Sequence, residues 1–402
     1  MGDEFDGEDY DDDYGDDGGD DYTEVSDQSW FSRMGQSIKS VGLGLLIFIA
    51  AFPLIWKNEG CAVRIAKGLQ EGAKNVIILQ EPKVKSSNNS KLVHFSGDAA
   101  TNETLKDNEL GINENAIKIS RSVEMYQWRE VVKTKTKKKL GGGKKTIKKY
   151  KYKKGWSSTI INSDNFKRRR SKYTNPQVMA ISSKSIVANN VNVGEFKLPK
   201  SLIGSITSGD TVTFTRKNID ALPDRLSSKA RIQDGKLYIG DPSNPKVGDL
   251  RISATIVKPQ KVSIIAKQQG NSLTSYKTGQ GTTIMMLKTG IVSAKDMFTA
   301  AEEGNVMRTW LLRLLGFILM FAGLSMIFKP VVTLGDVVPI VGSILNFGVG
   351  VMAGVVSFAL TFIVIALAWV FYRPIIGIPM LVIGIGAFVA FKIMGKNKKA
   401  NA

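Results

Sequence analysis

Apolar residues are concentrated in four stretches near the two ends of the chain, at positions 41–56, 309–328, 347–371 and 375–391. A helix needs about 20 apolar residues to cross about 30 Å of hydrocarbon. The second and third stretches meet this length, and the first and last reach it with the help of flanking lysines that extend to the headgroups. The pattern predicts four transmembrane helices, one N-terminal and three C-terminal.

The long polar segment at 57–308 has the alternating pattern of β-strands, for example at 91–96 and 261–266. Its most basic stretch, at 130–156, alternates Lys with Thr, Ile and Tyr on both sides of three consecutive glycines, which predicts a long hairpin. Twelve lysines between positions 133 and 154 repel one another, so the hairpin tip is expected to be solvated. The predicted fold is an α+β membrane protein with a large β-rich extracytoplasmic domain.

The segments around these regions have compositions of their own. Residues 1–28 contain 14 acidic and no basic residues, which predicts a disordered, acidic cytoplasmic tail. Residues 29–40 mix aromatic and polar positions and are expected to be an interfacial lead-in to the first span. Residues 329–346 are apolar but interrupted by Gly and Pro, which favours a re-entrant or interfacial segment. Residues 392–402 are expected to form a basic cytoplasmic tail.

Basic residues on the short flanks of the spans predict the orientation. Arg33 and Lys39 precede the first span, Lys329 follows the second, and several lysines follow the last. By the positive-inside rule these flanks, and with them both termini, lie in the cytoplasm, and Arg373 is the single opposing charge. The β-rich domain is then expected on the other side of the membrane.

The charge of the β-rich domain indicates an anionic partner. Residues 57–308 contain 46 basic and 21 acidic side chains, a net charge of about +25. Clusters of basic residues near a membrane attract anionic headgroups. The candidate contacts with anionic lipid or a surface polymer are Lys137, Lys138, Lys139, Lys144, Lys145, Lys148, Lys149, Lys167, Arg168, Arg169 and Arg170. A merely solvated charged face is the alternative, and nucleic acid is not expected because it is scarce outside the cytoplasm.

Polar groups in or near the spans are a second set of candidates, because ionisable residues at membrane depth are costly and suggest function. Arg313 and Arg373 are placed near the outer face, where extension to the headgroups is the simpler explanation. Asp336 and Asn346 are placed at the cytoplasmic end, where they can form a polar cluster. The small residues that predict close helix packing, and with it a homo-oligomer, are Gly348, Gly350, Ala353 and Gly354.

The sequence contains little catalytic chemistry. His94 is the only histidine and lies in an alternating strand pattern, and Cys61 is the only cysteine. Hydrolytic triads need a nucleophile with a base, and zinc sites of the His/Cys type need several such residues. We therefore expect no enzyme activity, no metal and no cofactor. A single cysteine also excludes an intrachain disulfide.

A series of short motifs runs in order along the chain. Its members are Asn58-Glu59-Gly60, Leu92-Val93-His94 with Gly97, Val123-Glu124-Met125-Tyr126-Gln127-Trp128, Ile160-Ile161-Asn162-Ser163 with Asn165-Phe166, Val247-Gly248-Asp249-Leu250-Arg251, Ile265-Ala266 with Gln269-Gly270, Thr309-Trp310 with Arg313 and Gly316, and Phe371-Tyr372-Arg373-Pro374. Together they resemble the transmembrane protein 43 family, also called LUMA, over about residues 22–395. The lead-in at 22–39 resembles prokaryotic members more than animal ones. The acidic head and the lysine-rich hairpin depart from the family's general pattern.

The resemblance implies a four-span protein with both termini in the cytoplasm and the large domain on the other side, which agrees with the flanking charges. In animals the family resides in the endoplasmic reticulum and inner nuclear membrane. There it is thought to organise membrane proteins, to associate with lamins and emerin, and to self-associate. A prokaryotic member would lie in the cell membrane and would have no lamin or emerin to bind. The resemblance implies no catalytic residues.

The function predicted from the sequence is a non-enzymatic membrane scaffold or membrane-organising protein. It is expected to self-associate and to contact anionic lipid or polymer, with other membrane proteins among its partners. Two alternatives stay open. One is a membrane-embedded lipid-handling enzyme that uses residues 329–346, and the other is a channel subunit, which so few spans permit only as an oligomer.

Overall fold

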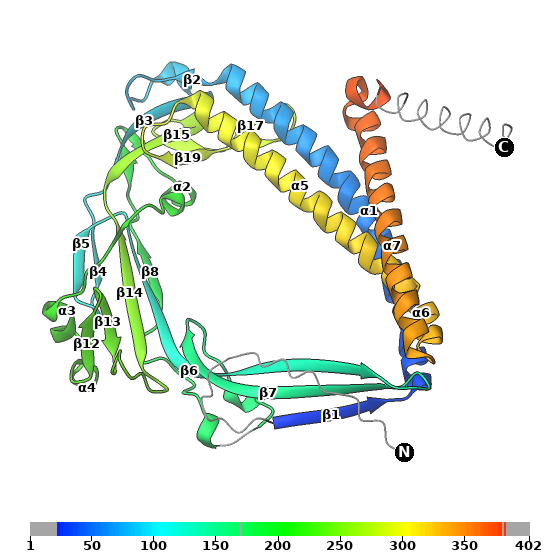
Figure 1. Ribbon diagram of the computed structural model, residues 1–402. Helices are drawn as coiled ribbons and strands as arrows, with labels where there is room; N and C mark the ends of the chain where they lie inside the picture. Colours follow the sequence, from blue (N-terminus) through cyan, green and yellow to red (C-terminus); the bar gives the residue numbers. More distant parts are fainter. Residues whose placement is uncertain (1–21, 169–170, 380–381, 383–402) are drawn as a thin grey trace.

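The computed structural model describes residues 22–168, 171–379 and 382, and these form a ring of long helices and β-sheets around an open centre (Figure 1). The helical side consists of α1 (Trp30–Asn75), α5 (Ala294–Ile327) and α7 (Pro339–Tyr372), with the short α6 (Lys329–Gly335) between the last two. Among the described residues, α1, α5 and α7 are long and apolar enough to cross a membrane. Most of the fourth predicted span, 375–391, lies outside the described residues, although 374–379 are helical.

The first two long helices extend well beyond the predicted spans. α1 begins after Ser29, whose Oγ accepts a hydrogen bond from the Ser32 backbone N–H at 3.3 Å, and it continues without a break to Asn75. The predicted lead-in at 29–40 and first span are therefore parts of one helix. α5 begins after Ser293, whose Oγ accepts a hydrogen bond from the Asp296 N–H at 3.1 Å, as its capping pattern indicates.

The segment at 329–346, predicted to be irregular, is helical on both sides of a short turn. α6 ends at Gly335, and α7 begins with Pro339 in its first turn. Proline is tolerated there because the first N–H groups of a helix have no partner within it. The re-entrant or interfacial placement stays a prediction, but the Gly and Pro residues do not make the backbone of the segment irregular. They mark the end of one helix and the start of the next.

Two sheets form most of the β-rich part. The first has eight strands: β1 (Tyr22–Gln28), β6 (Lys118–Lys138), β7 (Lys144–Ser157), β8 (Lys184–Val187), β11 (Asp210–Thr211), β12 (Ala230–Gln233), β13 (Lys236–Ile239) and β14 (Leu250–Val257). The second has seven strands: β2 (Ile77–Ile78), β3 (Leu92–Ala100), β9 (Asn192–Val193), β10 (Phe196–Lys197), β15 (Gln260–Gln269), β16 (Ser272–Thr274) and β19 (Met286–Thr289).

Smaller elements complete the β-rich part. Two strand pairs stand apart from the large sheets: β4 (Thr104–Asp107) with β5 (Ile112–Asn115), and β17 (Tyr276–Lys277) with β18 (Thr283–Ile284). Three short helices, α2 (Lys200–Ser205), α3 (Arg216–Asp220) and α4 (Asp224–Ser227), lie in the connections.

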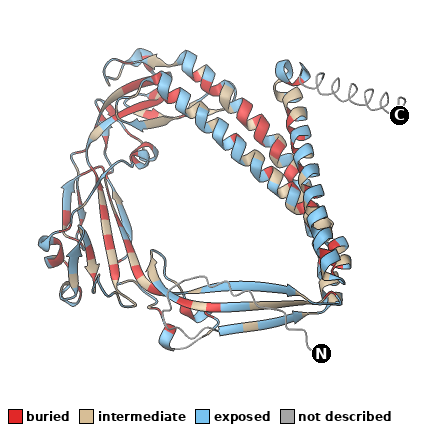
Figure 2. Ribbon diagram, viewed as in Figure 1, coloured by how far each residue is buried: buried red, intermediate tan, exposed pale blue. Residues whose placement is uncertain are grey.

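The apolar core follows the alternation of the central strands. Buried positions alternate with more exposed ones along β6 and β14 (Figure 2). Phe95 and Phe196 stack in this core with their ring centroids 4.5 Å apart. A second cluster, which includes Leu69, Ile284 and Phe298, joins α1 and α5 to the sheets. The C-terminal part of α1 and the N-terminal part of α5 are therefore anchored in the β-rich part.

The predicted lysine-rich hairpin is confirmed, and its tip, exposed at residues 139–141, also contacts the ends of the helices. β6 pairs with β7 as far as Lys138↔Lys144, and Gly141 and Gly142 adopt φ values of 80° and 76° in the turn. Gly142 lies so close to the Trp30 ring that a Cβ would be 2.9 Å from Trp30 Cγ. The Gly141 N–H donates to the Val337 carbonyl at 3.1 Å. These contacts with the helix ends close the ring.

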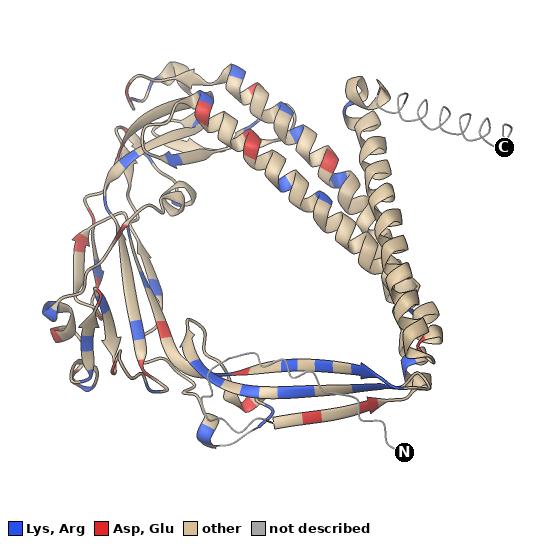
Figure 3. Cartoon of the chain, viewed as in Figure 1, with Lys and Arg blue, Asp and Glu red and all other residues tan. Residues whose placement is uncertain are grey.

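Residues 22–28, predicted to be disordered, form β1 and pair antiparallel with β7 along their whole length. Lysines face lysines across β6 and β7, and like charges directly opposite destabilise a sheet. β1 offsets this repulsion because Glu24 lies opposite Lys148 and Asp27 opposite Lys145 (Figure 3). The prediction considered the acidic segment alone and missed this cross-strand charge pairing. The rest of the predicted tail lies outside the described residues.

The ring has a consequence for membrane topology. β1 precedes α1 in the chain, yet it shares a sheet with β7, which follows α1. A planar bilayer crossed by α1 would separate the two strands, and a hairpin with so many lysines does not pass through hydrocarbon. The β1–β7 pairing and the orientation predicted from the flanking charges therefore exclude each other. A molecule whose α1 crosses the bilayer must have β1 separated from β7.

Candidate functional site

A buried ion pair joins the three long helices at the end of the bundle nearer the second sheet. Glu59 on α1 accepts hydrogen bonds from Arg313 Nε and Nη2 on α5 at 2.7 and 2.8 Å. It also accepts one from Trp369 Nε1 on α7 at 2.8 Å. Beside them, Asn58 Nδ2 donates to the Thr309 carbonyl at 3.2 Å. We refer to these five residues as the Glu59 cluster.

Aromatic rings surround the charged groups of the Glu59 cluster. The Arg313 guanidinium lies 4.6 Å from the Trp310 ring centroid and 5.6 Å from that of Trp369. The Arg373 guanidinium lies 5.9 Å from the Trp369 centroid. A guanidinium above an aromatic face is attracted by the ring quadrupole. The rings therefore stabilise both cations where the apolar part of the bundle begins.

A glycine permits close contact at the same level. A Cβ on Gly60 would lie 2.6 Å from Tyr372 Cζ, so the α7 side chain can rest directly on the α1 backbone only because this residue is glycine.

The structure places Arg313 and Arg373 differently from the sequence expectation of extension to the headgroups. Arg313 turns inward to Glu59, and its side chain is only 12% exposed. Arg373 lies just beyond the end of α7 with Trp369 as its neighbour. Sequence reasoning missed Glu59 because it ended the first span at residue 56. The signal was available, since the motif that contains Glu59 directly follows the span and continues its helical pattern.

A second buried carboxylate lies at the opposite end of the bundle. Asp336, in the turn after α6, accepts hydrogen bonds from Arg33 Nη2 on α1 and from Lys138 Nζ at the hairpin tip, the latter at 2.5 Å. Arg33 Nη1 also donates to the Gly142 carbonyl at 2.5 Å. Burial raises the pKa of the Asp336 carboxyl, but the bonds from Lys138 and Arg33 outweigh burial and hold that pKa below its ordinary value.

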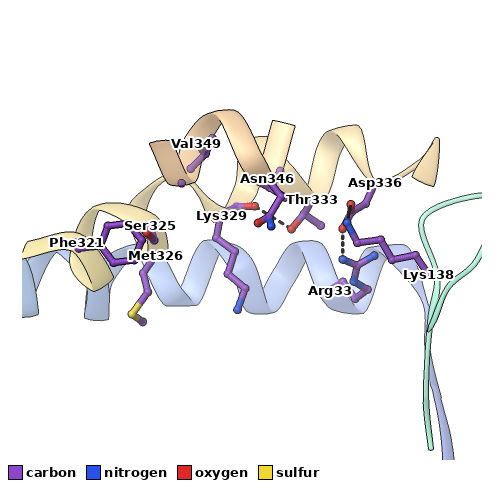
Figure 4. Close-up of a pocket in the computed structure, with 12 residues that line it drawn as sticks. Arg33, Lys138, Phe321, Ser325, Met326, Lys329, Thr333, Asp336, Asn346 and Val349 are labelled. Carbon is purple, nitrogen blue, oxygen red and sulfur yellow. Dashed lines mark hydrogen bonds and ion pairs between the residues drawn. The ribbon is translucent and has the colours of Figure 1, made fainter. Parts of the chain in front are cut away.

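A cavity of about 450 Å³ lies beside Asp336, between the helices and the hairpin tip (Figure 4). Its polar lining comes from Arg33, Lys138, Lys329, Asp336 and Asn346, and its apolar lining includes Phe321, Met326, Val332 and Val349. The sequence placed Asp336 and Asn346 in one polar cluster. The structure brings both to this cavity, but Asp336 bonds to the two cations and Asn346 lies farther along α7.

The hairpin lysines divide into paired and exposed groups. Lys138 forms an ion pair with Asp336. Lys139 Nζ lies 2.7 Å from Asp27 Oδ1, and Lys167 Nζ lies 3.1 Å from Glu24 Oε2. Glu24 also accepts a hydrogen bond from the Tyr150 hydroxyl, and that bond and the one from Lys167 lower the pKa of its carboxyl. The other candidate lysines on β6 and β7 are accessible to solvent. Lys137, Lys148 and Lys149 are exposed, and Lys144 and Lys145 are half-exposed.

The basic run that follows the hairpin is only partly described. The Arg168 backbone N–H donates to the Tyr152 hydroxyl at 2.9 Å. Burial and a hydrogen bond to Glu130 raise the pKa of that tyrosine to about 12. Arg169 and Arg170 lie outside the described residues.

The predicted small-residue series is not where the helices of one chain approach most closely. A Cβ on Gly348 or Gly350 would meet no atom within 4 Å, and one on Gly354 would lie 3.9 Å from Phe321 Cε2. Only Ala353 of the series is fully buried. The close approach is between α1 and α5, where a Cβ on Gly323 would lie 2.8 Å from the backbone oxygen of Gly44.

These features define the class: a membrane protein with apolar helices joined by buried ion pairs and a large β-rich part between the first two of them. The chain belongs to the transmembrane protein 43 family, whose model, Transmembrane protein 43, matches residues 125–374. Transmembrane protein 43 of Mus musculus is 32% identical over 364 residues, which cover 88% of this chain and 89% of the mouse protein.

Other relatives show the same extent of similarity. Transmembrane protein 43 of Homo sapiens is 32% identical over 361 residues, 87% of this chain and 88% of the human protein. The homologue of Drosophila melanogaster is 28% identical over 363 residues, 87% of this chain and 93% of its own length. No solved structure is significantly similar to the chain.

Motifs that carry the family resemblance at distant points of the sequence meet in space. Asn58-Glu59-Gly60, Thr309-Trp310, Arg313 and Tyr372-Arg373 all lie in or beside the Glu59 cluster. The Glu59 cluster therefore explains in physical terms why these residue types occur together: they join three helices at the level where an apolar bundle begins.

Proposed function

We propose that this protein is a non-catalytic membrane scaffold that self-associates through its helices and gathers anionic lipid with its lysine-rich hairpin. The observation that carries the proposal is the surplus of positive charge on the hairpin. β1 supplies two carboxylates, whereas Lys137, Lys144 and Lys149 are among the lysines that remain at exposed or half-exposed positions. A basic surface of this kind attracts anionic headgroups by about 1 kcal/mol per charge.

Self-association is supported by the open glycines of α7. Gly348 and Gly350 face no atom of their own chain, and small residues at this spacing allow a second helix to approach closely. The face is therefore available to another copy of the protein. Other membrane proteins are expected as further partners, since the same face is not specific to one helix.

The proposed location is an integral membrane position with both termini in the cytoplasm and the β-rich part on the other side, as the flanking charges predict. The membrane is the cell membrane in a prokaryote, and the endoplasmic reticulum or inner nuclear membrane in a eukaryote. The fourth span, at 375–391, belongs to this proposal. In that orientation β1 is separated from β7, which removes Glu24 and Asp27 from the hairpin and increases its surplus charge.

The lipid part is tested by native mass spectrometry of the full-length protein released from nanodiscs that mix phosphatidylglycerol and phosphatidylcholine. Replacing four hairpin lysines, Lys144, Lys145, Lys148 and Lys149, by Gln should lower the enrichment of phosphatidylglycerol by about tenfold or more. The matched control replaces four exposed lysines elsewhere: Lys91, Lys184, Lys236 and Lys258. Equal enrichment in both variants would contradict the proposal.

The self-association part is tested by the mass of the protein in the same nanodiscs. Gly348→Leu should shift an oligomer toward the monomer, because the new side chain fills the open face. Gly42→Leu is the control, since Gly42 also faces no atom within 4 Å but lies on α1. A monomeric wild-type protein would overturn this part.

A second candidate function uses the cavity beside Asp336. In the crossing orientation Lys138 leaves this cavity with the hairpin tip. The remaining cations, Arg33 and Lys329, and the apolar wall match a lipid headgroup with its chains, which supports a lipid-handling role for the segment that begins with α6. Under this reading, Asp336→Asn changes the composition of a lipid pool in cells that express the protein. An unchanged lipid composition would eliminate this candidate.

A further inference from the structure

A groove with its own chemistry runs along α1 and α5 where the apolar bundle meets the β-rich part. Two adjoining cavities, of about 400 and 440 Å³, lie along it. Cys61 and Arg308 line both cavities, so the two are halves of a single groove. The groove is separate from the Lys-rich hairpin and from the cavity beside Asp336.

The two halves are lined by different parts of the molecule. One half is lined by residues of the apolar helix segments, Ala50, Pro53, Leu54 and Leu312, together with Lys57 and Asn58. The other half is covered by the β17–β18 turn, which contributes Gly281, Thr282 and Thr283. Small side chains at Ala50 and Pro53 leave room beside α1. Ile65, Leu69, Met286 and Ala301 also line this second half, so the groove is mainly apolar along its length and its polar groups lie at the cations and the β17–β18 turn.

Three cations line the groove: Lys57 in the first half, Arg64 in the second, and Arg308 in both. All three are exposed, and no acidic side chain lines either cavity. The nearby carboxylate, Glu59, is buried and bonded to Arg313. Lys57 directly follows the apolar segment of α1 and Arg308 directly precedes that of α5, which is the level of lipid phosphates in a crossing bundle.

We infer that this groove binds one anionic phospholipid. Its phosphate lies among Lys57, Arg64 and Arg308, one acyl chain follows Ala50, Pro53 and Leu54 into the bilayer, and its headgroup lies under Thr282 and Thr283. The three cations match the charge of such a molecule, and the mainly apolar lining of both halves matches its acyl chains. The bound lipid would hold the β17–β18 turn against the membrane surface and couple the β-rich part to the bilayer.

Cys61 allows the inference to be tested, because it is the only cysteine and lines both halves of the groove. In nanodiscs, the rate at which N-ethylmaleimide modifies Cys61 should fall when phosphatidylglycerol replaces part of the phosphatidylcholine. Lys57→Gln with Arg308→Gln should remove this protection, since losing two interfacial cations weakens anionic lipid binding by about tenfold or more. Both side chains are exposed, so the double variant is expected to fold.

Two controls separate a bound lipid from a general surface effect. Lys67→Gln with Lys74→Gln removes the same charge from exposed positions of α1 away from the groove, and should leave Cys61 protected. Met307→Cys in a Cys61→Ser background reports an exposed position at the same level as Arg308 but outside the groove. At residue 307, replacing phosphatidylcholine by phosphatidylglycerol should slow modification less than it does at Cys61, because only the general surface charge acts there.

The outcomes decide the inference. Protection of Cys61 that depends on phosphatidylglycerol and on Lys57 and Arg308 supports it. Equal protection by phosphatidylcholine alone, or equal protection at residue 307, overturns it. Since the hairpin lysines take no part in this assay, failure here leaves the scaffold proposal standing, and failure of the hairpin test leaves this site standing.

Discussion

Glu59 and Arg313 form a bidentate ion pair between α1 and α5, with nitrogen–oxygen distances of 2.7 and 2.8 Å. Only 2% of the Glu59 side chain is exposed. The third helix, α7, joins the pair through the indole of Trp369. One carboxylate thus holds three helices that are distant in sequence, at the point where the bundle emerges from its apolar segment.

Removing the carboxylate charge should destabilise the bundle strongly. Glu59→Gln leaves the buried Arg313 without a counter-ion, which typically costs about 3–5 kcal/mol. We expect a large fall in the thermal unfolding midpoint of the full-length protein in nanodiscs. The double variant Glu59→Leu with Arg313→Met should recover much of the loss, because an apolar pair needs no desolvation of charge.

The control for this prediction is Glu303→Gln, which removes an exposed carboxylate from the same region of α5. It should change the free energy of unfolding by no more than about 0.5 kcal/mol. If Glu59→Gln were as mild as Glu303→Gln, the ion pair would not be what joins the helices.

Close packing of α1 against α5 leads to a second prediction. Gly323→Leu places a side chain where even a Cβ would lie 2.8 Å from the backbone oxygen of Gly44, so the two helices must move apart. Overpacking of this kind costs about 1–3 kcal/mol or more. Thermal unfolding in nanodiscs should show this loss for Gly323→Leu and almost none for Gly42→Leu, whose added side chain meets open space. Similar midpoints for the two variants would contradict the observed packing.

The sequence predicted elements well where a single local period decides them. The alternation in 261–266 corresponds to β15, and the lysine-rich repeat corresponds to β6 and β7. Local periodicity also located the apolar helices. The apolar spans at 41–56 and 309–328 are parts of α1 and α5, which continue as more polar helices that pack on the sheets.

The sequence failed mainly to predict contacts between residues that are distant along the chain. Arg313 was expected to extend to the headgroups because nothing local offers it a carboxylate, whereas Glu59 lies 254 residues earlier. The acidic residues of 22–28 were expected to be solvated for the same reason, although their partners lie on β7. Composition identifies such charges but does not say which of them meet, since that depends on how the whole chain folds.

His94 predicts a pH dependence of stability. Burial lowers the pKa of this histidine below its ordinary value of 6.5, and a bond to the Val292 carbonyl at 3.0 Å offsets burial only in part. Because a carbonyl only accepts, His94 Nε2 donates this bond, and Nδ1 is left buried without a partner. Its register partners on the flanking strands, Ile78 and Ile265, are apolar. The site therefore favours the neutral ring.

The sign follows from proton binding. Below about pH 6.5 the unfolded chain binds a proton at His94 more readily than the folded chain, so the free energy of unfolding falls as the pH falls toward the folded pKa. Above about pH 6.5 the ring is neutral in both the folded and the unfolded chain, so its full contribution to the free energy of unfolding is present. His94→Gln keeps a donor for Val292 but does not titrate. The difference in unfolding midpoint between wild type and this variant should therefore change with pH on the acidic side, and a constant difference would contradict the prediction.

The closed ring and membrane crossing by α1 can be tested against each other through Ser26 and Thr146, which are register partners in β1 and β7. Directly opposed residues of an antiparallel pair are close enough for a disulfide. In a Cys61→Ser background, Ser26→Cys with Thr146→Cys should cross-link readily in detergent, where no bilayer separates the strands. In liposomes the cross-link should be absent, because the flanking charges place residue 26 in the cytoplasm and residue 146 outside it.

Labelling with a membrane-impermeant maleimide completes this experiment. Single cysteines at Gly35, on the first part of α1, and at Ser243, in an exposed turn of the β-rich part, should be modified from opposite sides of the liposome. A cross-link in molecules labelled from opposite sides would contradict the exclusion between pairing and crossing. Labelling of both positions from one side, with the cross-link present, would overturn the predicted orientation. It would show that β1, with Glu24 and Asp27, stays on the lysine-rich hairpin in the membrane.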